Sequence, residues 1–185
     1  MEENKKSPVK YLLVKLAIFL VLAVLIFVFK DQAIANLRNF IGTLMIVYGV
    51  EAIVFELIFS RKKFFHQNKN YLGFIEIVLG ITLLIFDMDF QTVCVIWATW
   101  SIVRESYEIK EIVTETNSIP LAILSGVETS AVIVLSVMLI INASEEHAIL
   151  HSYLLIVELI LTPLIPLLNE FIIHSHQKAK NTEEK

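Results

Sequence analysis

The chain of 185 residues has little of what soluble folds use for crosslinks, turns and solvation: one cysteine, five glycines, four prolines and 18% charged residues. A soluble domain averages about 25% charged residues. The single cysteine, Cys94, excludes an intrachain disulfide and a cysteine-cluster metal site. Because glycine and proline supply most tight turns, their scarcity leaves little room for turn-rich β structure. These absences favour an all-helical fold.

What the sequence has instead is long apolar runs, with 56% hydrophobic residues and a mean hydropathy of +0.71. The runs are apolar on every side, whereas a membrane β-barrel alternates apolar and polar positions. A spanning helix needs about 20 mostly apolar residues. We therefore predict an all-α polytopic membrane protein with one domain of six transmembrane helices, residues 11–173, and short cytoplasmic tails, 1–10 and 174–185. The predicted spans are 12–29, 40–59, 71–86, 90–107, 121–141 and 148–173.

The fourth and sixth spans are interrupted by charged residues or prolines, and the N-terminal span has an alternative interpretation. The charge-free core of the fourth ends at Val103, and Pro163 and Pro166 predict a kink in the sixth. Lys15, the apolar run 16–29 and the segment Ala33-Ile34-Ala35 also match a signal peptide, whose cleavage would leave five spans. The repeat described below favours six.

The basic residues predict the orientation, because Lys and Arg accumulate in short cytoplasmic loops. Of the 15 basic residues, all but Lys30 and Arg38 lie before or near the start of the first span, after the last, in the loop after the second, or near the end of the fourth and in the loop after it. The opposite side carries all three aspartates, Asp31, Asp87 and Asp89, together with the pair Glu145 and Glu146. We predict a multi-pass protein of the cell (inner) membrane with both termini in the cytoplasm.

A repeat of about 53–59 residues divides the chain into three units. The apolar segment 21–27 matches 80–86, each is followed by a polar break, and 136–141 ends in the same way at Asn142. Glu51, Glu105 and Glu158 are separated by 54 and 53 residues. This period, with a short polar turn inside each unit, indicates three helical hairpins.

The third span carries the motif Gly73-x-x-Glu76-x-x-x-Gly80-Ile81-x-Leu83-Leu84. With this motif and its three predicted hairpins, the chain resembles the HdeD-like membrane proteins over residues 16–172. That family is built from a short repeat of unknown function. The resemblance implies a six-helix inner-membrane protein with a stress-response role, since the founding member is linked to acid resistance. It supplies no catalytic or ligand-binding residues, and Val21 and Ser136 replace the Gly80-type glycine in the other units.

Ionisable residues at membrane depth are functional candidates, because inserting one costs about 2.5–3.5 kcal/mol. On the last span the polar residues fall within about 60° of one another on an ideal helix. They form either a packing face, which we favour, or a proton or ion path entered through the histidines. A metal bound by His147 and His151 with Glu145 or Glu146 is a weaker possibility. The candidate residues on this and the other spans are Glu51, Glu76, Arg104, Glu108, Glu128, His147, His151 and Glu158.

Arg104 has several possible partners. It can pair with Glu108, four residues along the same helix, and extend to the cytoplasmic interface, or it can reach inward to Glu76 or Glu128. A structural ion-pair layer is the favoured interpretation. Glu51 points away from the helix face that carries Gly42 and Gly49, and no partner can be assigned to it from the sequence.

No motif indicates an enzyme: the sequence lacks a phosphate-binding glycine loop, a His-Glu-x-x-His pair and a nucleophile beside an obvious base. We expect no cofactor, no metal and no nucleic-acid partner. The expected partners are the lipid bilayer, to which the basic stretch 61–66 adds headgroup attraction, and another copy or a membrane protein. The preferred hypothesis is a structural or stress-response bundle. The alternative is a proton-linked channel or small-solute transporter that uses Glu76, Glu128 and Glu158.

Overall fold

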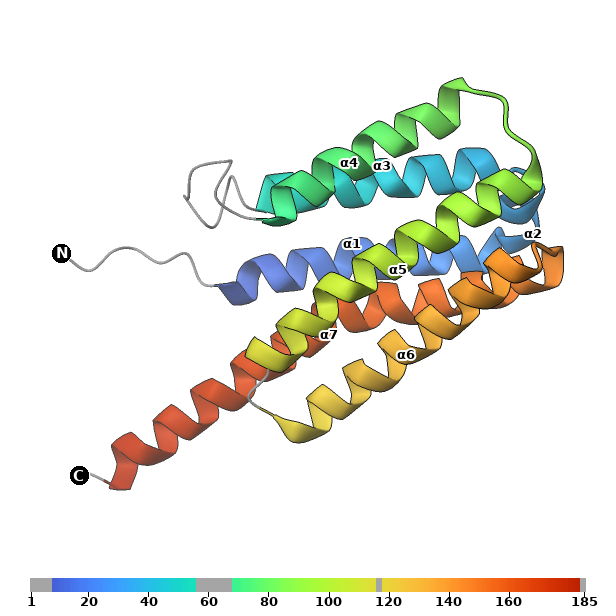
Figure 1. Cartoon of the computed structure of the whole chain (residues 1–185). Coiled ribbons are helices and arrows are strands. Elements are labelled where there is room, and N and C mark those ends of the chain that lie inside the picture. Colours follow the sequence, from blue (N-terminus) through green and yellow to red (C-terminus); the bar gives the residue numbers. More distant parts are fainter. Residues whose placement is uncertain (1–7, 56–67, 116–117, 184–185) are drawn as a thin grey trace.

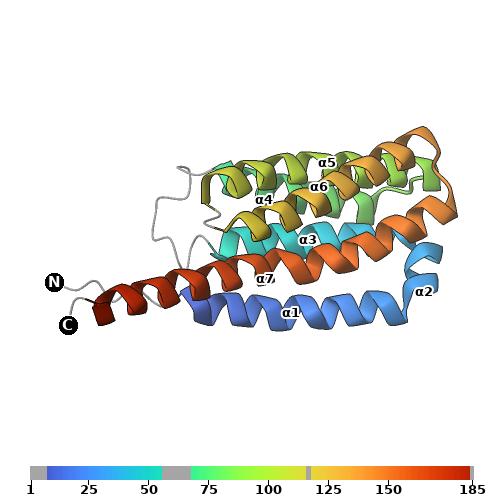
Figure 2. The same ribbon diagram turned by 90° about the horizontal axis from the view of Figure 1, so that it is seen from below.

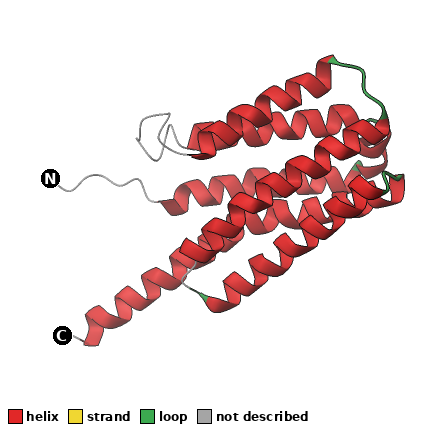
Figure 3. Ribbon diagram, viewed as in Figure 1, coloured by secondary structure: helices red, strands yellow, loops and turns green. Residues whose placement is uncertain are grey.

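The computed structural model describes residues 8–55, 68–115 and 118–183, and the regular elements in these ranges are all helices (Figure 3). The all-α prediction is therefore confirmed for the described chain. The end of the predicted second span, 56–59, and the basic stretch 61–66 lie outside these ranges. In chain order the helices are α1 (Pro8–Val28), α2 (Lys30–Ala35), α3 (Leu37–Phe55), α4 (Asn68–Ile85), α5 (Phe90–Glu115), α6 (Ile119–Ile141) and α7 (Glu145–Glu183).

Four of the described helices are long and apolar enough to cross a membrane: Val9–Val28, Leu37–Val54, Ile119–Ile141 and Glu145–Ile172. The apolar part of α4, Tyr71–Ile85, is shorter. The second half of α5 is charged, beginning with Arg104 and Glu105. Large apolar side chains are exposed along the surface; Val21 is 58% and Phe27 61% exposed. Because soluble proteins rarely expose extended apolar surface, this composition fits a membrane protein.

The long helices run back and forth along one axis, so that α1 begins and α7 ends at the same end of the bundle (Figures 1 and 2). We call this the terminal end. The opposite end, the α2 end, carries α2 and the connections 86–89 and 142–144. Residues 174–183, which were predicted to be a tail, continue α7, and the helix runs unbroken through Pro163 and Pro166.

The helices that lie closest together are α3 with α4, α1 with α7 and α5 with α6, followed by α6 with α7. The three-hairpin repeat would instead pair α1 with α3 and α4 with α5, so it stays a prediction. α1 and α3 still meet through side chains. The ring of Phe19 on α1 lies edge-on to Tyr48 on α3, with centroids 5.4 Å apart.

Glycines bring α3 and α4 together. A Cβ on Gly49 would lie 2.3 Å from the carbonyl oxygen of Gly73, and one on Gly80 would lie 2.5 Å from that of Gly42. Such distances are closer than any side chain tolerates, so the two backbones touch directly. All four glycines are buried inside the chain and leave no small-residue face there for a second copy.

Local capping sets the helix starts at the α2 end. Asp89 precedes α5, and its carboxylate accepts hydrogen bonds from the Thr92 backbone N–H (2.8 Å) and hydroxyl (2.9 Å). These bonds hold the pKa of Asp89 below its usual value. Glu145 and Glu146 begin α7, where the helix dipole favours acids. The short polar connections are therefore true helix boundaries.

Candidate functional site

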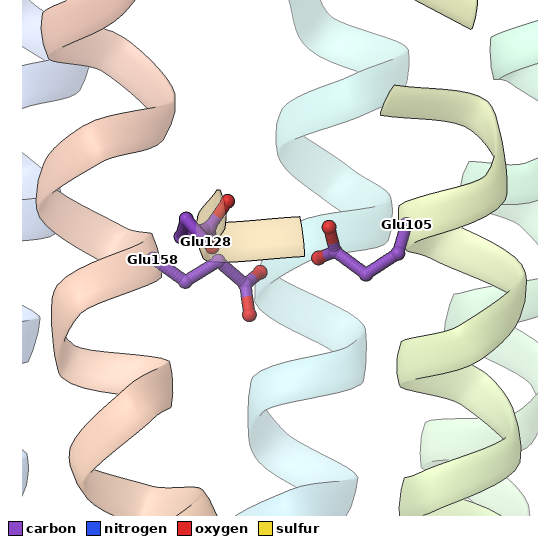
Figure 4. Close-up of side chains that lie close together, drawn as sticks. All are labelled: Glu105, Glu128 and Glu158. Atoms are coloured by element: carbon purple, nitrogen blue, oxygen red, sulfur yellow. The ribbon is translucent and has the colours of Figure 1, made fainter. Parts of the chain in front are cut away.

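Three carboxylates from three helices meet inside the bundle. Glu105 comes from α5, Glu128 from α6 and Glu158 from α7, and each offers an oxygen within 4.8 Å of the others. They are 0%, 7% and 4% exposed, respectively. Figure 4 shows Glu105 and Glu158 pointing toward each other, with Glu128 beside Glu158. We call these residues the Glu105–Glu128–Glu158 cluster.

The cluster lies deep within the helices. Glu128 is thirteen residues before the end of α6 at Ile141, and Glu158 is thirteen residues after the start of α7 at Glu145. At 1.5 Å per residue, each is about 20 Å from the α2 end. The hydrocarbon core of a bilayer is about 30 Å thick. If α6 and α7 span the membrane, the cluster lies inside that core.

Arg104 is the cation of the cluster. Its guanidinium makes a 2.8 Å ion pair with Glu158, and both side chains are less than a tenth exposed. The guanidinium also lies over the ring of Tyr48, 3.6 Å from the centroid, and 5.6 Å from that of Trp100. The Arg104–Glu158 ion pair therefore lies beside two further buried carboxylates, and the three carboxylates would repel one another if all were ionised.

A second set of polar contacts lies on the α1, α3 and α4 side. The Trp100 indole N–H donates a 2.9 Å hydrogen bond to Glu76. Glu51 forms a 2.9 Å ion pair with Lys15 and accepts a hydrogen bond from the Tyr11 hydroxyl. Glu51 therefore has partners on α1 that helix periodicity could not identify, since periodicity does not say which helices are neighbours.

His147 and His151 of α7, both candidate site residues, lie in different surroundings. His151 is 2% exposed, its Nε2 lies 3.2 Å from the Ser101 hydroxyl, and its ring is edge-on to Trp97 at 4.5 Å. His147 is half-buried, with Nδ1 2.8 Å from the carbonyl oxygen of Asn142.

A metal site built from these histidines and the acids at the start of α7 is not formed. Glu145 and Glu146 are exposed, whereas His151 faces α5. Within the described ranges, the side chains close enough to share a metal ion are those of the Glu105–Glu128–Glu158 cluster.

The structure brings only some of the predicted residues together. Arg104, Glu128 and Glu158 share the cluster, and Glu76 is linked to it through Trp100. An inward reach of Arg104 was one of the alternatives left open, and the structure shows it with an ion pair to Glu158, a partner that the sequence had not indicated. Glu51 and His147 lie elsewhere, and the side chain of Glu108 is outside the described part of the chain.

The sequence interpretation missed Glu105 as a site residue, along with its neighbour Ser101. A signal was present, because Glu105 falls between Glu51 and Glu158 at nearly equal spacing. A cavity elsewhere in the bundle offers no second ionisable site. It is an apolar crevice of about 510 Å³ between α1, α2 and α3, and no ionisable side chain lines it.

Comparison with protein-family models, curated proteins and solved structures found no match for this chain. The resemblance to HdeD-like proteins therefore stays a prediction. Any function must be argued from the Glu105–Glu128–Glu158 cluster and its surroundings.

Proposed function

We propose that this chain is a proton-linked membrane protein without catalytic activity, in which the Glu105–Glu128–Glu158 cluster takes up and releases protons. The observation that carries the proposal is the meeting of three buried carboxylates whose oxygens lie within 4.8 Å of one another. Like charges held this close in a buried site repel, which favours the protonated form of a carboxylate. Binding a proton would relieve this repulsion, so the cluster is suited to bind and release protons.

Protons suit this cluster better than a divalent metal does. The guanidinium of Arg104 already occupies one oxygen of Glu158 at 2.8 Å. A second cation placed among the carboxylates would be repelled by that guanidinium, and the repulsion is strong where the dielectric constant is low. A proton binds to one oxygen and adds no separate charge beside Arg104.

The proposal includes six spans with the α2 end outside and both termini in the cytoplasm. The alternating run of the helices supports it, as does the concentration of basic residues in the loops assigned to the terminal end. In this arrangement α4 and α5 cross the bilayer although they are shorter or more polar than the other four. Three charged groups of these helices, Glu76, Arg104 and Glu105, are buried in the bundle.

A structural or stress-response role of the HdeD-like kind is the second candidate. The buried Arg104–Glu158 ion pair and the glycine contacts of α3 and α4 are features that a purely structural bundle would also use. In that case the carboxylates stabilise the fold, and function depends on partner proteins or on self-association.

Proton flux into liposomes separates the two candidates. The purified protein is reconstituted with a pH-sensitive dye inside, the membrane potential is clamped with potassium and valinomycin, and an inward pH gradient is imposed. We expect acidification faster than in empty liposomes, and loss of that excess rate in Glu158→Gln and Glu128→Gln. Glu146→Gln, an exposed acid at the start of α7, is the matched control and keeps the rate.

Folding and insertion are checked for each preparation by circular dichroism and protease protection. If folded, inserted wild-type protein acidifies liposomes no faster than empty ones, the proton-linked function is wrong. The structural candidate then predicts that Glu158→Gln lowers thermal stability in detergent without any change in flux.

A further inference from the structure

His151 is a buried titratable group that the Glu105–Glu128–Glu158 cluster does not include. It lies six residues after the start of α7, which is about 9 Å from the α2 end. Its Nε2 is 3.2 Å from the Ser101 hydroxyl, and its Nδ1 has no hydrogen-bond partner within the described ranges. Buried polar atoms are normally satisfied, so a buried imidazole with one ring nitrogen left over requires an explanation.

Ser101 connects this histidine with the cluster. On α5, Ser101 precedes Arg104 by three residues and Glu105 by four, so the three side chains lie on one helix face. Ser101 is itself 5% exposed. His151 and Ser101 are thus in contact, and Glu105 follows one helical turn further along the same face of α5. The neighbouring ring of Trp97 is edge-on to the imidazole.

We propose that protons reach the cluster from the α2 end through His151 and Ser101, an inference that rests on the proposed function. A proton binds at Nδ1 of His151 while the Nε2 proton passes to the Ser101 oxygen. The hydroxyl proton of Ser101 then passes to a carboxylate oxygen of Glu105. The imidazole and the hydroxyl each end with the number of protons they began with, and one proton has moved inward.

The charged groups around His151 favour this direction. On α5 the nearest are Arg104 and Glu105, and on α6 Glu128 belongs to the cluster below. α1 has no titratable side chain between Lys15 and its end at Val28.

On the same side of the bundle, Lys30 of α2 donates a 2.7 Å hydrogen bond to Tyr153. On α7 itself, His147 is held at the α6 end by Asn142, and Glu158 is paired with Arg104. The three carboxylates of the cluster lie further from the α2 end than His151, and they attract a proton inward from the imidazole.

The liposome assay tests the route with paired variants. His151→Gln keeps a polar side chain that cannot carry a proton, and it is expected to lower the excess initial rate about a hundredfold, the low end for a positioned proton carrier. His147→Gln, one helical turn away and outside the route, should keep the wild-type rate. Ser101→Ala should lose the rate, and Ser101→Thr, which retains the hydroxyl, should restore it.

Ser101→Thr changes the side-chain volume more than Ser101→Ala does, but it keeps the hydroxyl. If Ser101 acted only through packing, the threonine variant would therefore not recover the rate. If wild type conducts protons and His151→Gln or Ser101→Ala conducts equally well, the route is wrong and the proposed function stands. If folded wild type conducts no protons, both are overturned.

Discussion

Arg104 holds the polar interior together at the scale of single residues. Its guanidinium is paired with Glu158 at 2.8 Å and covered by the ring of Tyr48, and it is 7% exposed. Removing one member of a buried ion pair leaves the other uncompensated, which typically costs about 3–5 kcal/mol. The contacts of Arg104 are therefore worth more than those of an exposed pair, which contribute at most about 1 kcal/mol.

We expect Arg104→Gln to lower the free energy of unfolding by about 3–5 kcal/mol, because Glu158 keeps its burial and loses its cation. The double variant Arg104→Gln/Glu158→Gln should lose less than the single one, since no charge is left unpaired. Equilibrium unfolding in mixed detergent micelles, analysed as a double-mutant cycle, measures both. An equal or larger loss in the double variant would mean that the pair is not the main contact of either residue.

The identity of such partners is what the sequence could not supply. Helix periodicity places Arg104 and Glu158 at compatible depths, and insertion cost marks both as candidates. Helix periodicity does not fix how α5 and α7 rotate and tilt against each other. That rotation decides whether Arg104 meets Glu76, Glu128 or Glu158. The same limit hid the contact of Glu51 with Lys15, which joins α3 to α1.

At the scale of helices, the contact of α3 with α4 depends on the absence of side chains. A Cβ on Gly49 would meet the Gly73 carbonyl oxygen at 2.3 Å and Cγ1 of Ile77 at 2.7 Å. Gly126 on α6 is the matched position, because a Cβ there would meet nothing within 4 Å. The two glycines occupy similar helical backbone and differ in what surrounds them.

We therefore expect Gly49→Ala and Gly126→Ala to change stability in opposite directions. Overpacking at Gly49 should lower the free energy of unfolding by about 1–3 kcal/mol. At Gly126 alanine should raise it by about 0.5–1 kcal/mol, because glycine loses more backbone entropy in a helix. Thermal unfolding of both variants in one detergent gives the comparison. A stabilising Gly49→Ala would show that α3 and α4 are not in backbone contact.

Helix positions were largely predictable, because each long apolar run ends at a polar cluster that starts a turn. The predicted spans 12–29 and 121–141 fall within two residues of the ends at Val28 and Ile141, and within four of the starts at Pro8 and Ile119. The short helix α2 was not predicted, since its polar sequence Lys30–Ala35 has no apolar periodicity to reveal it. Helix neighbours were not predictable either, because identical apolar surfaces pack equally well in several orders.

At the scale of the whole molecule, the packing order explains where the carboxylates gather. α5 packs on α6 and α6 on α7, so the acids of these three helices meet, while α3 joins them through α5. α1 closes the arrangement against α7 and α4 against α3. The cluster is therefore made by the second half of the chain, and the first half covers it.

The number of spans decides whether this cluster lies within the bilayer, and one position discriminates between four and six. Asp87, whose side chain is fully exposed, lies in the connection between α4 and α5. If both helices cross, Asp87 is on the same side as Asp31 and Glu145. If neither crosses while the four apolar helices do, Asp87 is on the side of Lys10 and Ile119.

We expect single cysteines at Asp31, Asp87 and Glu145 to react with a membrane-impermeant maleimide added to intact cells, and cysteines at Lys10 and Ile119 to react only after lysis. The background is Cys94→Ala, which removes the one native thiol, itself buried. All five positions are exposed, so failure to react reports the membrane barrier and not burial in the protein. Labelling of Asp31→Cys and Glu145→Cys without Asp87→Cys would leave four spans and place Arg104 outside the hydrocarbon core. The ion-pair penalty and the proton route would then have to be explained at the membrane surface, where water supplies the missing partners.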